Sequence, residues 1–209
     1  TGSKLFIQLA AGFGRSMAVA PWMVTLNNNK LLGALARPVI DVSYCCASAS
    51  ATPNRWQEDM LSRPMTVEEI HEMVDAFGKT AKLLREAGVD GVEIHAVHEG
   101  YLLDQFTMAN WNHRTDKYGG SFENRFRFPV EIVQEIKRQA GADFPVSLRY
   151  SVVSKTKAWG KGAMPYETDF EEFGRDMAES EKAVKYLEEA AYDMFNCDNG
   201  TYDAWYWAH

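Results

Sequence analysis

The chain has 209 residues, enough for one sizeable core, and 46% hydrophobic with 24% charged residues is the composition of an ordinary globular protein. Its formal net charge of -7, without any cluster of Lys and Arg, argues against a nucleic-acid partner, because phosphate binding requires grouped basic side chains. Neither an apolar run of the roughly 20 residues that a membrane helix needs nor a signal-peptide pattern is present, so we expect one cytoplasmic domain.

The three cysteines lack the spacing of a disulfide framework or of a zinc or iron-sulfur site. Cys45 and Cys46 are adjacent, and Cys197 is distant from both. Free cysteines are among the residues most often buried in proteins. We therefore expect packed or loop thiols, and no metal bound by this chain.

The chain opens with a strand at residues 5–9, whose alternation places Gln8 on the face opposite Leu5, Ile7 and Leu9. A glycine-rich turn, AAGFGR, follows this strand. Residues 16–63 have no sustained hydrophobic period and contain three prolines. We interpret them as a long excursion with room for a small hairpin, because loops of this length are usually functional lids or disordered.

Three helices and three more strands follow the excursion. The clearest helix opens with a capping-box signature from Thr66 to Glu69, and its apolar residues then recur at three- and four-residue steps. The expected segments are a helix at 66–88, a strand at 89–95, a helix at 121–141, a strand at 146–150, a helix at 170–191 and a strand at 193–197.

Strands that alternate with helices are typical of parallel α/β proteins. The two candidates are an open doubly wound sheet and a (β/α)8 TIM barrel. No GxGxxG motif follows any strand, which weakens the case for a dinucleotide-binding fold. The longest polar loops follow the strands, where a barrel has its active site. We therefore expect part of a TIM barrel.

Several polar side chains are predicted to face inward. Strand alternation turns Gln8, Glu93, His95, Ser147 and Arg149 to the side opposite the helices. A buried guanidinium requires an anionic or strongly accepting partner. One interpretation pairs Arg149 with Glu93 inside the barrel. The other is a flat cofactor with carbonyl and ring-nitrogen acceptors, such as a flavin, whose reduced form carries negative charge that a guanidinium stabilises.

His95 ends the second predicted strand, and His98 and Tyr101 follow it in the next loop. A His-x-x-His pair can bind a metal, but such sites normally add a third protein ligand, and no obvious third ligand follows. His98 in a solvated loop, and Tyr101 packed against Phe106, are the structural alternatives. Two imidazole donors and a phenol also suit the polarisation and protonation of a conjugated carbonyl compound.

These segments resemble a known family. The runs HAVHEGYLLDQF and NHRTDKYGGSFENR look like the fourth βα loop of the old yellow enzyme family, and the likeness extends from FIQLAAGFGR to YDAWYWAH. The chain is most similar to the branch of 2-enoate reductases, 2,4-dienoyl-CoA reductases and bile-acid-inducible NADH:flavin oxidoreductases. Many family members have His-Gly-Tyr, whereas this chain has a glutamate between histidine and glycine, as that branch does.

The resemblance implies a role for each candidate residue. Residues that match Gln8 and Arg149 contact the FMN ring, and the one that matches His95 lies close to it. The residues that match His95 and His98 donate hydrogen bonds to the substrate carbonyl, and the one that matches Tyr101 protonates the α carbon. His209 is the candidate for a histidine that assists this tyrosine.

Three more residues belong to family motifs but have another interpretation. We expect Arg15, Asn124 and Arg125 to fasten loops, because the last two fall in the first turn of a helix, where side-chain capping is the ordinary role.

The resemblance also implies how much of a barrel is present. Residues 1–209 resemble strands three to six with their helices, in a single partial TIM-barrel flavin-binding domain that lacks the first two and last two strands. We expect an incomplete record of a longer chain rather than a true fragment, because exposed parallel edges promote aggregation. A full-length protein of this branch adds a 4Fe-4S cluster and FAD, which this segment does not ligate.

The leading hypothesis is an FMN-dependent ene-reductase or the reverse desaturase, which transfers hydride between NADH or NADPH and the C=C bond of an α,β-unsaturated carbonyl compound. The substrate would be an enoate, an enoyl-CoA or a 3-oxo-steroid of the bile-acid type. The alternatives are a metal-dependent TIM-barrel hydrolase or lyase using His95 and His98, and a non-catalytic barrel fragment. A homo-oligomer is compatible with the resemblance, and the sequence leaves the oligomeric state open.

Overall fold

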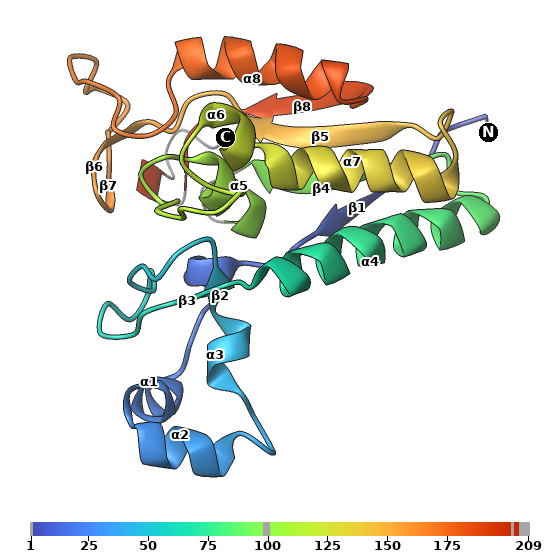
Figure 1. The fold of residues 1–209 in the computed structure, drawn as a ribbon. Coiled ribbons are helices and arrows are strands. Elements are labelled where there is room, and N and C mark those ends of the chain that lie inside the picture. The colour runs from blue at the N-terminus through green and yellow to red at the C-terminus, as the bar shows by residue number, and fades with distance from the viewer. Residues whose placement is uncertain (1, 98–100, 202, 205–209) are drawn as a thin grey trace.

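The computed structural model describes residues 2–97, 101–201, 203 and 204, and a four-stranded parallel sheet forms its centre (Figure 1). The strands lie in the order β1 (Phe6–Ala10), β4 (Gly91–Val97), β5 (Val146–Ser151) and β8 (Met194–Asp198). Spatial order therefore follows chain order. A doubly wound sheet reverses its order at a switch point, whereas a barrel winds in one direction, so this topology agrees with part of a (β/α)8 barrel.

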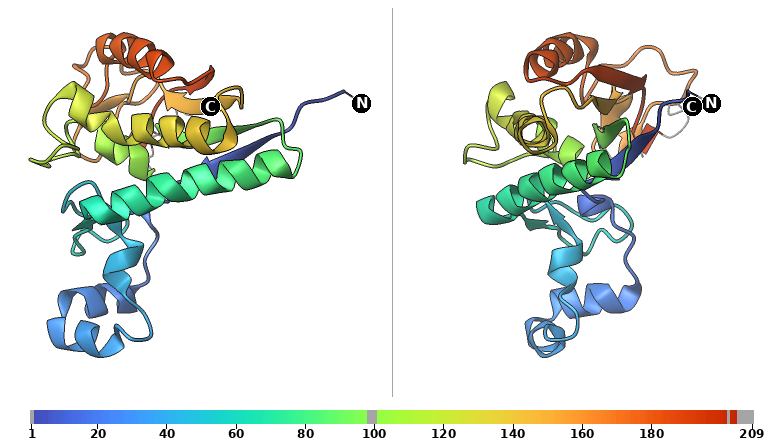
Figure 2. Two further views of the ribbon diagram at one scale, coloured as in Figure 1. Left: turned by 45° about the vertical axis from the view of Figure 1, so that its right-hand side comes forward. Right: turned by 90° about the vertical axis from the view of Figure 1, so that its right-hand side faces the viewer.

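One face of the sheet is covered by three helices, α4 (Val67–Glu86), α7 (Arg127–Ala140) and α8 (Met177–Glu189). They lie on the same side of the strands, as the right-hand view of Figure 2 shows. The strand side chains beneath these helices are apolar and completely buried: Val92, Ile94, Val146 and Leu148. The opposite face carries the polar side chains, which separates the core from the candidate site.

The predicted capping box of α4 is confirmed. Thr66 Oγ1 accepts a hydrogen bond from the Glu69 amide at 3.2 Å, and Glu69 Oε2 accepts one from the Thr66 amide at 2.8 Å. Arg63 donates two hydrogen bonds of 2.8 Å to the Glu69 carboxylate, which lowers the pKa of that group. The start of α4 is thus fixed by side chains on both sides of it.

The predicted helix at 121–141 is two helices. Ser121 caps α6 (Phe122–Arg125), and its Oγ accepts from the Asn124 amide at 3.3 Å. Phe126 then separates α6 from α7. The end of α7 is set by Gly141, whose φ of +110° strongly favours glycine.

The prediction for residues 16–63 was wrong in one respect, because the excursion contains three short helices. It contains the 3-10 turn η1 (Gly14–Ser16) at its start, α1 (Pro21–Asn28), α2 (Lys30–Ala36) and α3 (Val42–Cys45), and then β2 (Ala47–Ser48), which pairs in parallel with β3 (Arg63–Pro64). These helices are too short to show a hydrophobic period. Their signals are local: Pro21 fits the first helical turn, and Asn29 accepts hydrogen bonds from the amides of Leu31 and Leu32.

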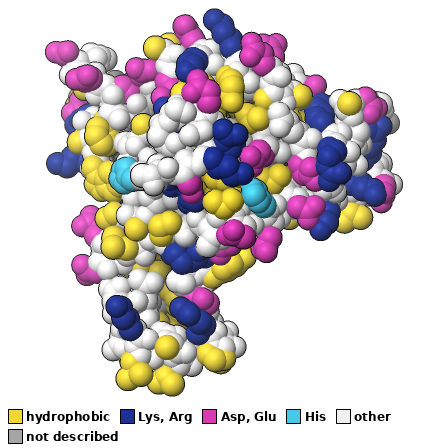
Figure 3. Space-filling view, in the orientation of Figure 1, with side chains coloured by type: hydrophobic (Ala, Val, Ile, Leu, Met, Phe, Trp, Pro, Cys, Tyr) yellow, Lys and Arg dark blue, Asp and Glu magenta, His cyan; other side chains and the backbone are white. Residues whose placement is uncertain are grey.

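The excursion projects away from the sheet (Figure 1). It has a small core of its own, formed by Val19, Met23, Val42, Cys46 and Met60. Hydrophobic side chains also gather on its outer end in the space-filling view (Figure 3). Among the helices of the described ranges, none has the length and apolarity that crossing a membrane requires.

The predicted helix at 170–191 starts later than expected, at Met177. Asp176 caps α8 by accepting from the Glu179 amide at 2.8 Å. The preceding loop holds a hairpin, β6 (Thr156–Ala158) with β7 (Lys161–Gly162). Glu172 accepts hydrogen bonds from the Thr156 and Lys155 amides, so the loop around Phe170 and Phe173 folds back on this hairpin instead of entering the helix.

Candidate functional site

A row of hydrogen-bonded polar groups crosses the face of the sheet that lies opposite the helices. Glu93, on β4, is at its centre. Gln8 Nε2 on β1 donates to Glu93 Oε1 at 2.6 Å, and Ser147 Oγ on β5 donates to Glu93 Oε2 at 3.1 Å. Asn196 Nδ2 on β8 approaches the two carboxylate oxygens at 3.4 and 3.2 Å. Four strands thus meet at one carboxylate.

A second row lies one step nearer the carboxyl ends of the strands. The paired Cα positions are Ala10, His95, Arg149 and Asn196, in the order of the strands. Strand alternation puts His95 on the same face as Glu93, and Arg149 on the same face as Ser147. The structure therefore brings Gln8, His95 and Arg149 to one face, as their alternation predicted.

The interpretation that pairs Arg149 with Glu93 was wrong. Arg149 instead binds Asp198 on β8, with Nε at 3.0 Å and Nη2 at 2.9 Å from Asp198 Oδ2. The reason is the register: Arg149 is paired with Asn196, and Asp198 follows two residues later on the same face. Both members of the pair are partly exposed, at 32% and 18%, so the guanidinium remains accessible at the polar face.

Sequence reasoning missed Asn196 and Asp198. Both lie on β8, which alternates Met194, Asn196 and Asp198 with Phe195 and Cys197. Phe195 packs against the main core beneath the helices. The signal was present in this alternation, because a strand with an aromatic residue on one face and two polar residues on the other predicts which face meets the site.

Tyr101 lies against His95 at the start of the next helix. The ring centroids are 3.8 Å apart, and Phe13 stacks on Tyr101 with centroids 5.2 Å apart. The pairing of β4 with β5 shifts register between His95 and Val97, and such irregularities commonly re-aim side chains beside active sites. His95 is 7% exposed, so the imidazole is held by its surroundings.

The short helix α5 (Leu102–Thr107), which the sequence did not reveal, holds Tyr101 in place. Gln105 on this helix is completely buried. Its Oε1 accepts from the Arg15 amide at 3.0 Å and from Ser48 Oγ at 2.5 Å, and its Nε2 donates to the Phe13 carbonyl at 2.9 Å. Gly14, with φ of +54°, leaves space for this amide, since a Cβ there would collide with Gln105. The glycine-rich turn after β1 is therefore fastened to the helix after β4.

A buried ion pair anchors the other side of α5. Arg175 Nη2 donates to Asp104 Oδ1 at 2.5 Å and to Thr107 Oγ1 at 2.6 Å, while Nη1 donates to the Ser151 carbonyl at 3.1 Å. Burial opposes the charge of Arg175, but Asp104 raises the pKa of the guanidinium above its ordinary value. This network joins α5 to the end of β5.

The residues interpreted as loop fasteners do fasten loops. Arg15 donates Nε to the Pro53 carbonyl at 2.9 Å and lies 3.9 Å from the centre of the Trp111 ring. Arg125 binds the Thr107 carbonyl and Glu179 on α8. Asn124 Nδ2 donates to the Gly119 carbonyl at 3.2 Å.

Two predicted catalytic residues, His98 and His209, lie outside the described residues. The metal alternative depended on His95 together with His98. Within the described ranges, no three His, Cys, Asp or Glu side chains lie close enough together to hold a metal ion. Tyr101, His95, Gln8 and Arg149 are therefore the predicted site residues that the structure places.

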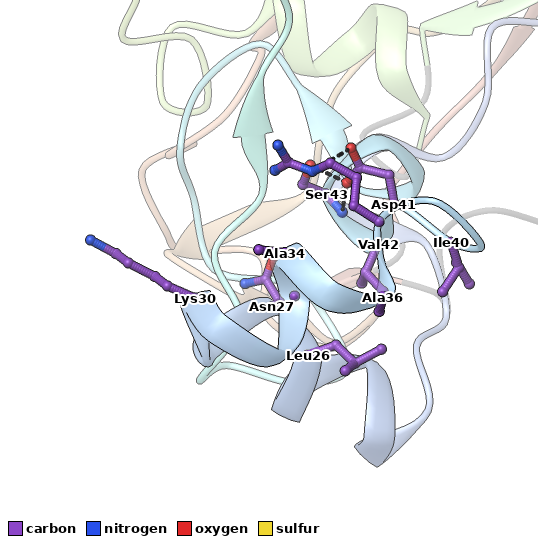
Figure 4. A pocket seen from close by; sticks show the side chains of 11 residues that line it. Leu26, Asn27, Lys30, Ala34, Ala36, Ile40, Asp41, Val42 and Ser43 are labelled. Carbon is purple, nitrogen blue, oxygen red and sulfur yellow. Dashed lines mark hydrogen bonds and ion pairs between the residues drawn. The ribbon is translucent and has the colours of Figure 1, made fainter.

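Among the cavities of the described residues, two differ in how they lie relative to the candidate site. One of about 320 Å³ lies where the turn after β1 meets α4 and α5, and Phe13, Met65, Met73 and Leu102 line it. It adjoins the aromatic stack of Phe13 on Tyr101. The other, of about 230 Å³, lies within the projecting excursion among α1, α2 and α3 (Figure 4). Its position in the excursion separates it from the polar face of the sheet.

Comparison with known proteins identifies relatives of the whole chain. The family described as NADH:flavin oxidoreductase / NADH oxidase matches residues 1–203. A cinnamate reductase of Clostridium sporogenes is 50% identical over 208 residues, which is 100% of this chain and 28% of that protein. The chain thus spans little more than a quarter of that relative.

Solved structures agree on the fold. A 2-naphthoyl-CoA reductase in complex with 2-naphthoyl-CoA has a TM-score of 0.60 and 30% identity, over 75% of this chain and 21% of that one. An old yellow enzyme homologue from Zymomonas mobilis has a TM-score of 0.57 and 24% identity, over 75% of this chain and 42% of that one. These likenesses confirm that the α/β sheet is part of a (β/α)8 TIM barrel.

Proposed function

Since this chain belongs to the NADH:flavin oxidoreductase / NADH oxidase family, in the enoate reductase branch of the old yellow enzymes, we propose that it forms the flavin site of an FMN-dependent ene-reductase. NADH or NADPH would be the reductant, and an α,β-unsaturated carbonyl compound the substrate. One observation supports this proposal above the others: an amide, an imidazole and a guanidinium from three neighbouring strands share one face of the sheet.

The donors and acceptors of this face fit a flavin. The pyrimidine edge of an isoalloxazine alternates carbonyl acceptors with one N–H donor, and the Gln8 amide offers both a donor and an acceptor. Arg149 uses Nε and Nη2 on Asp198, and its Nη1 meets no acceptor in the part of the chain that the structure describes. Gln8 and Arg149 would therefore hold the ring, with Arg149 at the edge that gains negative charge on reduction.

Bound FMN would supply hydride transfer between the nicotinamide and the substrate C=C bond. His95 would then donate a hydrogen bond to the substrate carbonyl oxygen and polarise the double bond, since its ring lies beside Tyr101 at the carboxyl end of β4. Tyr101 would protonate the α carbon from its phenol. His98 and His209 remain predictions for the second hydrogen bond and for the support of Tyr101.

The substrate class follows from the aromatic wall of the site. Phe13 and Tyr101 stack at its edge, with ring centroids 5.2 Å apart. An enoate or enoyl thioester with an aromatic or other flat apolar group fits such a wall better than a small polar enone. The name of the Clostridium relative, cinnamate reductase, agrees with this proposal.

Several finer statements rest on the sequence. Three statements stay predictions: a single flavin-binding domain over residues 1–209, a cytoplasmic location, and a 4Fe-4S cluster with FAD in the full-length protein. The sequence leaves the oligomeric state and the choice between NADH and NADPH open.

The proposal is tested by anaerobic half-reactions of the complete protein. We expect a yellow protein that NADH or NADPH bleaches, and whose colour returns when cinnamate is added without oxygen. A colourless protein that takes up no FMN, or a bleached protein that every unsaturated carboxylate and enone leaves bleached, would contradict it.

A further inference from the structure

The geometry points to Glu93 as the residue that sets the orientation of the Gln8 amide, and so decides which donors and acceptors face the flavin. This inference rests on the proposed function, because it concerns the same face of the sheet. It assigns Glu93 a positioning role, in which the carboxylate acts through Gln8.

The contact between Gln8 and Glu93 joins a side-chain amide to a carboxylate. An ionised carboxylate is an acceptor only, so a glutamine that touches it must present its Nε2 and not its Oε1. The separation of 2.6 Å between Gln8 Nε2 and Glu93 Oε1 is that of a strong charge-assisted hydrogen bond. Glu93 therefore fixes one of the two orientations that a glutamine amide can otherwise adopt.

This orientation leaves one donor and one acceptor of the Gln8 amide available. One Nε2 proton of Gln8 is bound to Glu93, and the other can still be donated. Gln8 Oε1 accepts from no donor within the described ranges. The amide thus presents one donor and one acceptor side by side, which matches the neighbouring carbonyl and N–H of a pyrimidine edge. If the amide flipped, its acceptor would face a carbonyl and its donor an N–H, and both contacts would be lost.

The Glu93 carboxylate is itself held by side chains of β5 and β8. Ser147 Oγ donates at 3.1 Å and Asn196 Nδ2 at 3.2 Å to the other carboxylate oxygen. Three strands besides its own therefore restrain the carboxylate. Among the described residues, the side chains that donate to Glu93 are all neutral, so no ion pair competes with Gln8 for the carboxylate.

The test is a double-mutant cycle on the FMN dissociation constant of the complete protein, measured by flavin fluorescence. Glu93→Gln is nearly isosteric but offers an amide that can donate to Gln8 Oε1 and reverse it. We expect this variant to bind FMN about tenfold more weakly, as the loss of one or two neutral hydrogen bonds implies. In a Gln8→Leu background the same change should weaken binding less than about twofold, because the residue it acts through is gone.

Glu86→Gln is the matched control. It makes the same chemical change at an exposed residue of α4, the helix that covers the other face of the sheet, so FMN affinity should stay within about twofold of wild type. Equal losses from Glu93→Gln in both backgrounds, or no loss in the wild-type background, would overturn the inference. A wild-type protein that binds no FMN would instead overturn the proposed function.

A second measurement avoids any change at Glu93. In wild-type protein labelled with ¹⁵N-glutamine, the Gln8 side-chain amide is identified by its disappearance in Gln8→Leu. We expect one of its two protons to be shifted strongly downfield by the carboxylate. Two protons with the shifts of a solvated glutamine would overturn the inference, even if Glu93→Gln failed to fold.

Discussion

The Tyr101 phenol lies where two separate parts of the chain restrain it. Its ring packs between His95 on β4 and Phe13 after β1, and Gln105 holds the Phe13 carbonyl from α5. A side chain that is restrained in this way has little rotamer freedom to lose on substrate binding, which suits a proton donor.

Replacement of Tyr101 by Phe tests this role. We expect NADH to reduce the flavin at about the wild-type rate, while alkene reduction slows about 10²- to 10⁴-fold, the usual contribution of a general acid. Anaerobic stopped-flow measurement of each half-reaction separates the two rates. The proton-donor role would be excluded if both half-reactions lost the same factor.

Arg149 forms an ion pair with Asp198, and we expect this pair to affect the reduction potential of the flavin. Asp198→Asn removes a negative charge next to the guanidinium. Because reduction adds negative charge to the flavin, we expect the two-electron midpoint potential to rise, by about 30 mV for each 1.4 kcal/mol of stabilisation. Potentiometric titration of the complete protein measures this shift. A lower potential in Asp198→Asn would contradict the placement of this pair beside the flavin.

At the scale of single elements, α5 depends on a buried ion pair. Asp104 and Arg175 are each only 1% exposed. Asp104→Ala leaves an uncompensated buried guanidinium, so we expect a loss of about 3–5 kcal/mol in the free energy of unfolding. Denaturant titration measures it, and amide hydrogen exchange should show α5 opening first. Lys182→Ala, which breaks the exposed pair with Glu123, is the control and should leave the free energy of unfolding nearly unchanged.

The start of α4 depends on its capping box. Thr66→Ala removes the side chain that accepts from the Glu69 amide, and we expect a loss of about 1 kcal/mol in the free energy of unfolding. The exposed Thr80 in the middle of α4 offers a matched control, because Thr80→Ala makes no such change and improves helix propensity. Equal thermal stability of Thr66→Ala and wild type would show that the cap contributes nothing.

Elements differed in how well the sequence predicted them. The long helices α4 and α7 were predictable because their apolar stripes repeat over several turns, and because α4 begins at a capping box and α7 ends at Gly141. The helices α1, α2 and α5 were not, because each has only two turns, and tertiary packing rather than period selects them. The late start of α8 reflects the contacts of Glu172 with the β6–β7 hairpin, which no local pattern records.

At the scale of the whole molecule, strand alternation predicted which polar residues share a face, but not which of them pair. Gln8, His95 and Arg149 came together as expected, because faces follow from the two-residue period of a strand. The partner of Arg149 depends instead on the register between β5 and β8, which only the folded sheet sets. Asn196 and Asp198, in contrast, could have been found from the alternation of β8 alone.

In the proposed site, side chains from neighbouring strands converge on one flavin. The most direct measurement is a crystal structure of the complete protein grown with FMN. We expect the isoalloxazine to lie on the polar face of the sheet, with its pyrimidine edge within hydrogen-bond distance of Gln8 and Arg149 and with His95 beside it. A flavin bound elsewhere, or a polar face filled by protein side chains that exclude it, would contradict this account.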